Sequence, residues 1–427
     1  MPDIIKKMVE DETLALLYPR FLDTPEVYRN RINAVCTGFI NTFGENENIR
    51  IFSAPGRTEI GGNHTDHQHG CVLAAGIDLD ILGASVPNGR KEIRFFSEGY
   101  GLETIDLTCM DVQKEEINTS ASLIRGIAAR LTQKGFEIKG FDVYAISNVL
   151  KGSGLSSSAA FEVLIGTIMN GLFCNGQVSA VEIAQIGQYA ENVYFGKPSG
   201  LMDQTASSVG NIVAIDFFDT EKPVVKKIDF EFAKTGYSLC IIDSGADHAD
   251  LTDEYASIPK EMKAVAGYFN KEYLRQVDKG VLIENIANVR KVVGDRAVIR
   301  ALHFYEDNDK AVLEAQQLEN GDFNGFLQTV RKSGYSSYMY LQNVSVTGSI
   351  KNQEVAYALA VCHELLGERG AFRVHGGGFA GTVQAFVPND MLNEFKKDVE
   401  KMIGEGCCHV ISIRPVGGVE LTKSNSK

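Results

Sequence analysis

A glycine- and serine-rich run that leads straight into an apolar segment constrains the fold of this chain most strongly. The run comprises Gly152, Ser153, Gly154, Leu155, Ser156, Ser157, Ser158 and Ala159. In the segment after it, which extends to Phe173, apolar residues recur at helical spacing, at Phe161, Leu164, Ile165, Ile168 and Leu172. We therefore predict a buried amphipathic helix whose N-terminus is the glycine- and serine-rich run.

This helix N-terminus has two interpretations. The first backbone N–H groups of a helix lack intrahelical partners, and the helix dipole favours an anion at that end. Glycines let the backbone approach a ligand closely, and serine hydroxyls add hydrogen-bond donors. Together these features indicate a phosphate-binding loop. An ordinary loop with a serine N-cap explains the same residues, and the run alone does not separate the two.

Length, charge and cysteine spacing exclude several classes of protein. A chain of 427 residues is long enough for two domains. Its net charge of −13 argues against nucleic acid or an anionic membrane as the main partner. The N-terminus has no apolar signal core, and no apolar run approaches the ~18 residues of a membrane-spanning helix. The eight cysteines form no Cys-x-x-Cys pair, so we expect reduced thiols and a cytoplasmic location.

The most polar cluster of the chain follows a short predicted strand, residues 51–57, that leaves into a turn. The cluster comprises Arg57, Glu59, Asn63, His64, Thr65, Asp66, His67, Gln68 and His69. Its three histidines lack the i, i+4 spacing of helical metal ligands and have no cysteine partners. A small, hydroxyl-rich ligand suits these side chains better than a metal, because each offers directional donors or acceptors.

The other segments alternate between helical and strand-like patterns. In the first half we predict helices over residues 1–45, 123–131 and 181–193, and strands over residues 71–75, 77–86, 93–96 and 141–146. A hairpin turn at Asn88 and Gly89 should join the second and third of these strands. The helix over 181–193 ends before a loop, residues 196–204, that carries Asp203 just after two glycines.

The second half begins with two predicted strands, residues 212–217 and 237–243, and continues with several helices between residues 254 and 365. A glycine cluster, residues 373–382, then lies between a helix and a predicted strand over residues 383–387, and three of its glycines, Gly376 to Gly378, are consecutive. Such a cluster is typical of a tight turn, and it could also contact a ligand held by the first domain.

The familiar nucleotide-binding fingerprints are absent from the sequence. It contains neither the Walker Gly-x-x-x-x-Gly-Lys-Ser/Thr motif nor a dinucleotide-binding Gly-x-Gly-x-x-Gly between a strand and a helix, and it lacks the protein-kinase signatures. If the chain binds phosphate, it does so with a different fold.

Three glycine-containing stretches, in this order, resemble the three motifs of the GHMP small-molecule kinases, and most closely those of the galactokinase family. Residues 56–66 are similar to the signature GRVNLIGEHTD, residues 154–159 to the second motif, and residues 373–381 to RMTGGGFGG. Shorter matches join them: residues 124–126 to V-R-G, residues 200–204 to GIMDQ, and residues 248–255 to H-x-L-x-x-S-E-Y. The resemblance covers most of the chain from about residue 50 to residue 390.

The resemblance implies an α+β fold with two domains. An N-terminal domain, residues 1–215, would be like ribosomal protein S5 domain 2 and would carry the sugar-binding motif and the phosphate loop for ATP. A C-terminal domain, residues 216–427, would be ferredoxin-like. The active site would lie between them, in a monomer or weak homodimer.

The resemblance also implies a reaction and the residues that perform it. The chain would use ATP and Mg²⁺ to phosphorylate the anomeric C1 hydroxyl of a hexose, most simply galactose. Asp203 would be the base or hydrogen-bond acceptor for that hydroxyl, with Arg57 beside it. The phosphate loop, residues 152–159, would bind ATP, and Ser158 and Glu191 would bind Mg²⁺. The sugar contacts implied are Asn63, His64, Asp66, Gly200 and Tyr255.

Four departures from the family pattern bear on the substrate. Asn63 stands where the family has a glutamate that accepts a hydrogen bond from the sugar's 6-hydroxyl. An amide can also accept that bond, so galactose stays possible, but it does not repel a carboxylate, so galacturonate or another sugar acid becomes an alternative. The other departures are Ala380 for a glycine, Pro259 and Lys260 for arginines, and the loss of a histidine in residues 333–337.

A third hypothesis is a catalytically silent sugar-sensing regulator on the same fold. We would expect such a protein to have lost part of the second motif or the base. Ser157, Ser158, Ala159 and Asp203 are all present.

Overall fold

The computed structural model describes residues 9–150, 154–197, 199–246, 251–379 and 381–422. The α-helices are α2 Asp11–Leu17, α3 Pro25–Phe43, α4 Ser120–Gln133, α5 Ser157–Phe173, α6 Ala180–Tyr189, α7 Met202–Val209, α8 Thr252–Tyr268, α9 Lys279–Val293, α10 Asp295–Glu319, α11 Phe323–Ser336, α12 Glu354–Leu366 and α13 Leu392–Met402. The strands are β1 Arg50–Gly61, β2 Cys71–Pro87, β3 Glu92–Ser97, β4 Gly101–Asp106, β5 Phe141–Ser147, β6 Ile212–Asp216, β7 Val224–Ile228, β8 Tyr237–Asp243, β9 Ala371–His375, β10 Thr382–Pro388, β11 Cys408–Ile411 and β12 Val419–Glu420. Shorter turns of helix include η1 Asp66–Gln68, the π-helix η3 Ala190–Phe195 that continues α6, and the π-helix η6 Ser337–Leu341.

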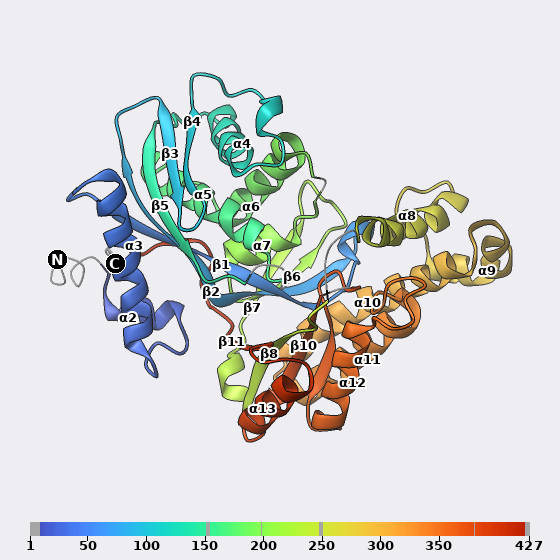
Figure 1. Ribbon diagram of the computed structural model, residues 1–427. Helices are drawn as coiled ribbons and strands as arrows, with labels where there is room; N and C mark the ends of the chain where they lie inside the picture. Colours follow the sequence, from blue (N-terminus) through green and yellow to red (C-terminus); the bar gives the residue numbers. More distant parts are fainter. Residues whose placement is uncertain (1–8, 151–153, 198, 247–250, 380, 423–427) are drawn as a thin grey trace.

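Within the described residues, one large sheet runs in the order β12-β1-β2-β5-β3-β4, with β6 and β7 attached beside β2. Helices cover both of its faces (Figure 1). Side chains alternate between faces along each strand. In β5, Phe141, Val143 and Ala145 join the core under α4 and α5, whereas Tyr144 and Ile146 pack against α2 and α3. The buried apolar residues of α2 and α3 therefore form a second core on the far side of the sheet.

Two predictions for the strands of this sheet are wrong. The segments 71–75 and 77–86 form one strand, β2, of 17 residues, which pairs with β1 along its length and changes partner from β6 to β5 on its other edge. The predicted hairpin at Asn88 and Gly89 does not form, because β5 lies between β2 and β3 and runs parallel to β3. β5 is buried on both faces and β3 on one, so β5 takes the more central position.

The strand β1 is longer than predicted at its polar end. Instead of leaving into a turn after Arg57, β1 continues to Gly61 and pairs with β2, with irregular register between Pro55 and Arg57 and again between Glu59 and Gly61. Such β-bulges bend a strand and re-aim its side chains. Arg57 and Glu59, two residues apart, both line the cavity described below.

A second, four-stranded sheet has the order β11-β8-β10-β9. Numbered along the chain this order is 4-1-3-2, and every neighbouring pair is antiparallel, which agrees with the expected ferredoxin-like arrangement. The first residues of the glycine cluster, Arg373 to His375, belong to a strand, β9, that we did not predict, so Gly376 to Gly378 lie in the loop of the β9–β10 hairpin.

The two sheets are closely joined. One face of the second sheet packs on α12 and α13, and its other face continues into the main core through Leu239 and Ile241. The chain also returns to the first sheet at its end, where β12 pairs with β1. The division at residue 215 stays a prediction. In the part of the chain that the structure describes, no helix is both long and apolar enough to span a membrane.

Candidate active site

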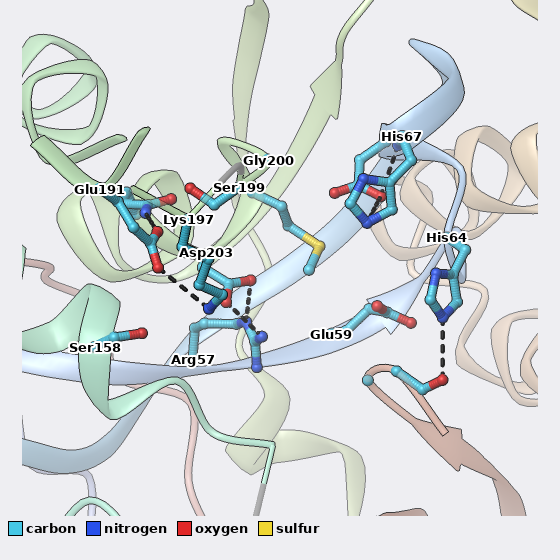
Figure 2. A pocket seen from close by; sticks show the side chains of 15 residues that line it. Arg57, Glu59, His64, His67, Ser158, Glu191, Lys197, Ser199, Gly200 and Asp203 are labelled. Carbon is cyan, nitrogen blue, oxygen red and sulfur yellow. Dashed lines mark hydrogen bonds and ion pairs between the residues drawn. The ribbon is translucent and has the colours of Figure 1, made fainter. Parts of the chain in front are cut away.

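A polar cavity of about 230 Å³ lies where β1, α5, α7 and the β9–β10 loop meet (Figure 2). Its volume suits a small polar molecule. The lining residues are Arg57, Glu59, His64, Asp66, His67, Ser158, Glu191, Lys197, Ser199, Gly200, Met202, Asp203, Gln204, Gly376 and Gly377. Elements of both sheets contribute to it, through β1 and the β9–β10 loop.

Arg57 and Asp203 form the centre of the cavity. Arg57 donates from Nε to Asp203 Oδ1 and from Nη2 to Oδ2, each at 2.7 Å, and the Ser156 hydroxyl donates to Oδ2 at 2.7 Å. Asp203 lies in the first turn of α7. Burial raises the pKa of its carboxyl, but the Arg57 charge and the bonds from Arg57 and Ser156 outweigh burial and hold this pKa below its usual value. Asp203 is therefore ionised at neutral pH and is a weak proton acceptor.

The predicted phosphate loop meets this pair at the start of α5. The Arg57 N–H donates to the Leu155 carbonyl at 3.0 Å, and the Arg57 guanidinium donates to the Gly154 carbonyl. A Cβ on Gly56 would lie 2.9 Å from that Leu155 oxygen, so this close approach of β1 to the loop requires glycine. Gly152 and Ser153 lie outside the described residues.

The serine N-cap interpretation of this loop does not hold as stated. Ser156 occupies the N-cap position, but its hydroxyl makes no capping bond and donates to Asp203 instead. Ser157 begins the helix, Ser158 lines the cavity and Ala159 is buried. This geometry favours a helix N-terminus that is open to an anion.

Ser158 and Glu191, the residues implied for Mg²⁺, both line the cavity. The Glu191 carboxylate, in η3, accepts from Lys197 Nζ at 3.2 Å and from Gln204 Nε2 at 3.0 Å. A hydroxyl and a carboxylate are hard oxygen donors, which fit Mg²⁺ shared with phosphate oxygens. Among the described residues, no group of three or more His, Cys, Asp or Glu side chains could hold a metal by itself, so phosphate would have to complete the shell.

The histidine cluster does not form a metal site. The ring of His69 stacks on Tyr273 with 3.7 Å between centroids, whereas His64 and His67 line the cavity. His64 Nε2 donates to the Gly377 carbonyl at 3.0 Å, and burial lowers the pKa of His64 to about 4. His64 is therefore neutral at physiological pH.

Asp66 and Gly200, both implied as sugar contacts, lie against each other in one wall of the cavity. A Cβ on Gly200 would lie 2.6 Å from Asp66 Oδ2, so glycine lets the loop before α7 close onto this carboxylate. With His64 they form a wall of acceptors and donors that suits a hydroxyl-rich ligand.

Asn63 is not in the cavity lining. Its side chain is fully buried. The amide donates to Glu59 Oε1 at 2.9 Å and to the Gly376 carbonyl at 2.7 Å, and its oxygen accepts from Asn343 Nδ2 at 2.9 Å. The Asn63 side chain thus bonds only protein groups and does not line the cavity, whereas His64 and Asp66 do.

Tyr255 also lies behind the wall of the cavity. Its hydroxyl donates to the Gly378 carbonyl at 3.0 Å, and its ring packs against Gly377 so closely that a Cβ there would lie 2.5 Å away. Tyr255 supports the glycine loop whose residues Gly376 and Gly377 line the cavity.

The site prediction omitted Glu59, which lines the cavity. Its Oε1 accepts from Arg373 Nη2 at 2.8 Å. Burial raises the pKa of Glu59 to about 7 in spite of the Arg373 charge. A signal existed in the signature GRVNLIGEHTD, where asparagine stands at position 59 and glutamate at position 63. The polar cluster already contained Glu59 and His67, and the glycine cluster already offered Gly376 and Gly377 as ligand contacts, although none of the four received a role. The lining residues Lys197, Ser199, Met202 and Gln204 were missed.

Comparisons with known proteins identify the family of this chain. The family model for the GHMP kinases N terminal domain matches residues 122–211, and that for the galactokinase galactose-binding signature matches residues 37–87. A galactokinase from Glaesserella parasuis serovar 5 (strain SH0165) is 30% identical over 84% of this chain and 91% of its own length. A galactokinase from Enterococcus faecalis (strain ATCC 700802 / V583) is 30% identical over 84% of this chain and 90% of its own length.

Solved structures show the same fold. The crystal structure of Lactococcus lactis galactokinase complexed with galactose superposes with a TM-score of 0.78 at 24% identity, covering 91% of this chain and 99% of that one. A mevalonate kinase structure superposes with a TM-score of 0.59 at 16% identity, covering 85% of this chain and 99% of that one. The predicted α+β fold of the GHMP kinases is therefore confirmed.

Proposed function

Because the chain belongs to the galactokinase family of the GHMP kinases, we propose that it transfers the terminal phosphoryl group of ATP to the C1 hydroxyl of a hexose, most simply galactose. The observation that carries this proposal is the contact between Asp203, Arg57 and the start of α5. The Ser156 hydroxyl, in the phosphate loop, lies 2.7 Å from Asp203. A hexose hydroxyl against Asp203 would thus lie next to phosphate at the helix N-terminus.

Asp203 would orient the C1 hydroxyl and accept its hydrogen bond. Its three bonds to Arg57 and Ser156 make the carboxylate a weak base, so we assign it the task of holding the hydroxyl and taking the proton late in the transfer. Arg57 would balance the negative charge that gathers between Asp203 and the phosphoryl group.

Two groups of residues would hold ATP and its metal. GHMP kinases use ATP, and the free N–H groups at the start of α5 would bind its phosphates. Ser158 and Glu191 would hold Mg²⁺, which supplies positive charge to the transferring phosphoryl group when bound. Lys197, which pairs with Glu191 and lines the cavity, would add positive charge beside the phosphates.

The sugar-acid alternative loses its supporting observation. It depended on an Asn63 amide that faces the substrate, and Asn63 is buried and bonded to protein groups. The carboxyl group of Glu59 lines the cavity instead, and in its ionised form, which predominates above its pKa of about 7, it would repel a hexuronate. We therefore favour a neutral hexose. A silent regulator is also disfavoured, because the second motif and the predicted base are both present in the sequence, and the described loop residue Ser156 bonds Asp203.

The test is ADP formation by the purified protein with ATP, Mg²⁺ and single sugars. We expect turnover with galactose or a close neutral relative, and a loss of about 10²–10⁴ in kcat for Asp203→Asn with sugar binding retained. Asp142→Asn is the matched control, since Asp142 is buried in an ion pair with Arg94 and does not line the cavity.

Turnover of no hexose and no hexuronate would refute the kinase proposal. Binding of ATP and sugar without ADP formation would instead support the regulator. The cytoplasmic location and the monomeric or weakly dimeric state stay predictions.

A further inference from the structure

Glu59 is placed to contact a substrate, although the proposed chemistry does not use it. It lies on β1 two residues after Arg57, and both side chains line the cavity. In Figure 2, Glu59 lies between Arg57 and His64, away from the phosphate loop. A ligand that bonds Asp203 with one end would therefore meet Glu59 with another part.

One carboxylate oxygen of Glu59 is held and the other is available. Oε1 accepts from Arg373 Nη2 at 2.8 Å and from Asn63 Nδ2 at 2.9 Å. Arg373 is itself fixed, because it is fully buried and also donates to the Ile60 carbonyl at 2.6 Å. Among the described residues, no protein donor bonds Oε2.

This oxygen is open to the cavity. Glu59 is only 5% exposed and lines the cavity, and Oε2 does not belong to the described side-chain oxygens that are both buried and unbonded, so Oε2 is accessible from the cavity side. A substrate hydroxyl in the cavity would supply the missing donor. A substrate carboxylate in the same place would meet ionised Glu59 and Asp66 as like charges.

We propose that Glu59 determines specificity by accepting, through Oε2, a hydrogen bond from a hexose hydroxyl remote from C1, and that it excludes a carboxylate at that position. This inference rests on the proposed function. Asn63 then acts as a positioning residue, because its amide holds Oε1 and so aims Oε2 into the cavity.

The experiment measures kcat/KM with galactose and with the monodeoxygalactoses that each lack one hydroxyl, for the wild type, Glu59→Gln and the control Asp142→Asn. With galactose, Glu59→Gln should lose about 10- to 100-fold, the usual worth of a hydrogen bond to a charged group. The loss should lie mainly in KM, because the contact is made in the ground state as well.

The deoxy sugars distinguish a direct contact between Glu59 and one sugar hydroxyl from a general structural effect of the substitution. For the one sugar that lacks the bound hydroxyl, Glu59→Gln should lose nothing further relative to the wild type, whereas for the others it should lose the full factor. An equal loss with every sugar would overturn the proposal, and so would an unchanged kcat/KM with galactose. Asp142→Asn should match the wild type throughout.

Galacturonate provides a measurement that does not depend on the folding of a variant. The wild type should discriminate against it relative to galactose, and equal turnover of the two would overturn the proposal. If Glu59→Gln does not fold, Glu59→Asp keeps the charge beside Arg373 but withdraws the oxygen, and it should show the same sugar-dependent pattern. A wild type that turns over no sugar contradicts the proposed function itself, whereas an active wild type with an indifferent Glu59 contradicts only this inference.

Discussion

Two carboxylates of one cavity differ in their titration because their partners differ. Asp203 accepts on both oxygens, from Arg57 and Ser156, and 31% of its side chain is exposed. Glu59 accepts on one oxygen only and is almost wholly buried. Burial raises the pKa of Glu59 to about 7, whereas Arg57 holds that of Asp203 below its usual value. A site can in this way keep one acid ionised while another titrates near neutrality.

The raised pKa of Glu59 predicts a pH-dependent stability. Arg57, Arg373, Asp66 and Glu314 face Glu59, and burial still dominates. The pKa of Glu59 rises from 4.5 to about 7 on folding. Its ionisation therefore leaves the free energy of unfolding unchanged below pH 4.5 and lowers it as the pH rises from 4.5 to about 7. Relative to Glu59→Gln, the wild type should therefore lose up to ~3 kcal/mol of unfolding free energy across that window.

Urea unfolding of both proteins at intervals between pH 4.5 and 8 measures this difference. The part of this difference that changes with pH reports the titration of Glu59, whereas the constant part reports the replacement of the carboxyl by an amide. A difference that stays flat across the range would show that Glu59 titrates as an ordinary carboxyl.

At the scale of elements, the approach of β1 to the start of α5 sets the geometry of the phosphate loop. The N–H of Arg57 bonds the Leu155 carbonyl at 3.0 Å, and α5 is buried on nearly all sides. Because the helix cannot easily move, the strand must come close to it, and Gly56 makes this possible.

Gly56→Ala should therefore disturb ATP use. The new Cβ would lie 2.9 Å from a backbone oxygen, so the loop has to shift at a cost of ~1–3 kcal/mol in stability. A misplaced phosphate loop could lower kcat/KM for ATP by as much as about 100-fold, measured by ATP titration at saturating sugar.

Gly267→Ala is the matched control for that substitution. Gly267, near the end of α8, has nothing within 4 Å of its would-be Cβ, so alanine should leave activity unchanged and add ~0.5–1 kcal/mol of stability. If Gly56→Ala behaved like this control, the close approach would not matter to the site.

At the scale of the whole molecule, Asp80 on β2 ties distant parts of the chain together. Its carboxylate accepts from Arg31 of α3 at 2.6 Å and from Arg414, near the C-terminus, at 3.0 Å, and also from Tyr18 and Ser53. These partners come from the N-terminal helices, from β1 and from the segment that leads to β12. One buried side chain therefore fastens both ends of the chain to the first sheet.

Asp80→Asn should destabilise the whole fold. Removing one partner of a buried ion pair leaves Arg414 uncompensated, which typically costs ~3–5 kcal/mol. Activity per folded molecule should not change, because Asp80 does not line the cavity. Thermal and urea unfolding measure the loss. Asp295→Asn, which breaks an exposed pair with Arg290, should have little effect, and equal effects of the two variants would contradict the assigned role.

Local patterns predicted the elements of this fold better than their partners. The helical period predicted α5, and apolar runs predicted β5, β8 and β10. The hairpin at Asn88 and Gly89 failed because turn residues describe only the backbone of the turn. Which strand lies beside β2 depends on burial of β5 on both faces, and β5 lies more than fifty residues further along the chain.

By itself, the sequence determined the family and placed Arg57 beside Asp203, and it predicted the phosphate loop, because these depend on residue types at fixed spacings. Only the tertiary structure decided which of Glu59 and Asn63 faces the cavity. Glu59 lies in β1 and Asn63 two residues after its end, and the buried Arg373 and Asn343 come from much later segments. Those distant partners take up the Asn63 amide and one oxygen of Glu59, and so leave the other oxygen to the cavity.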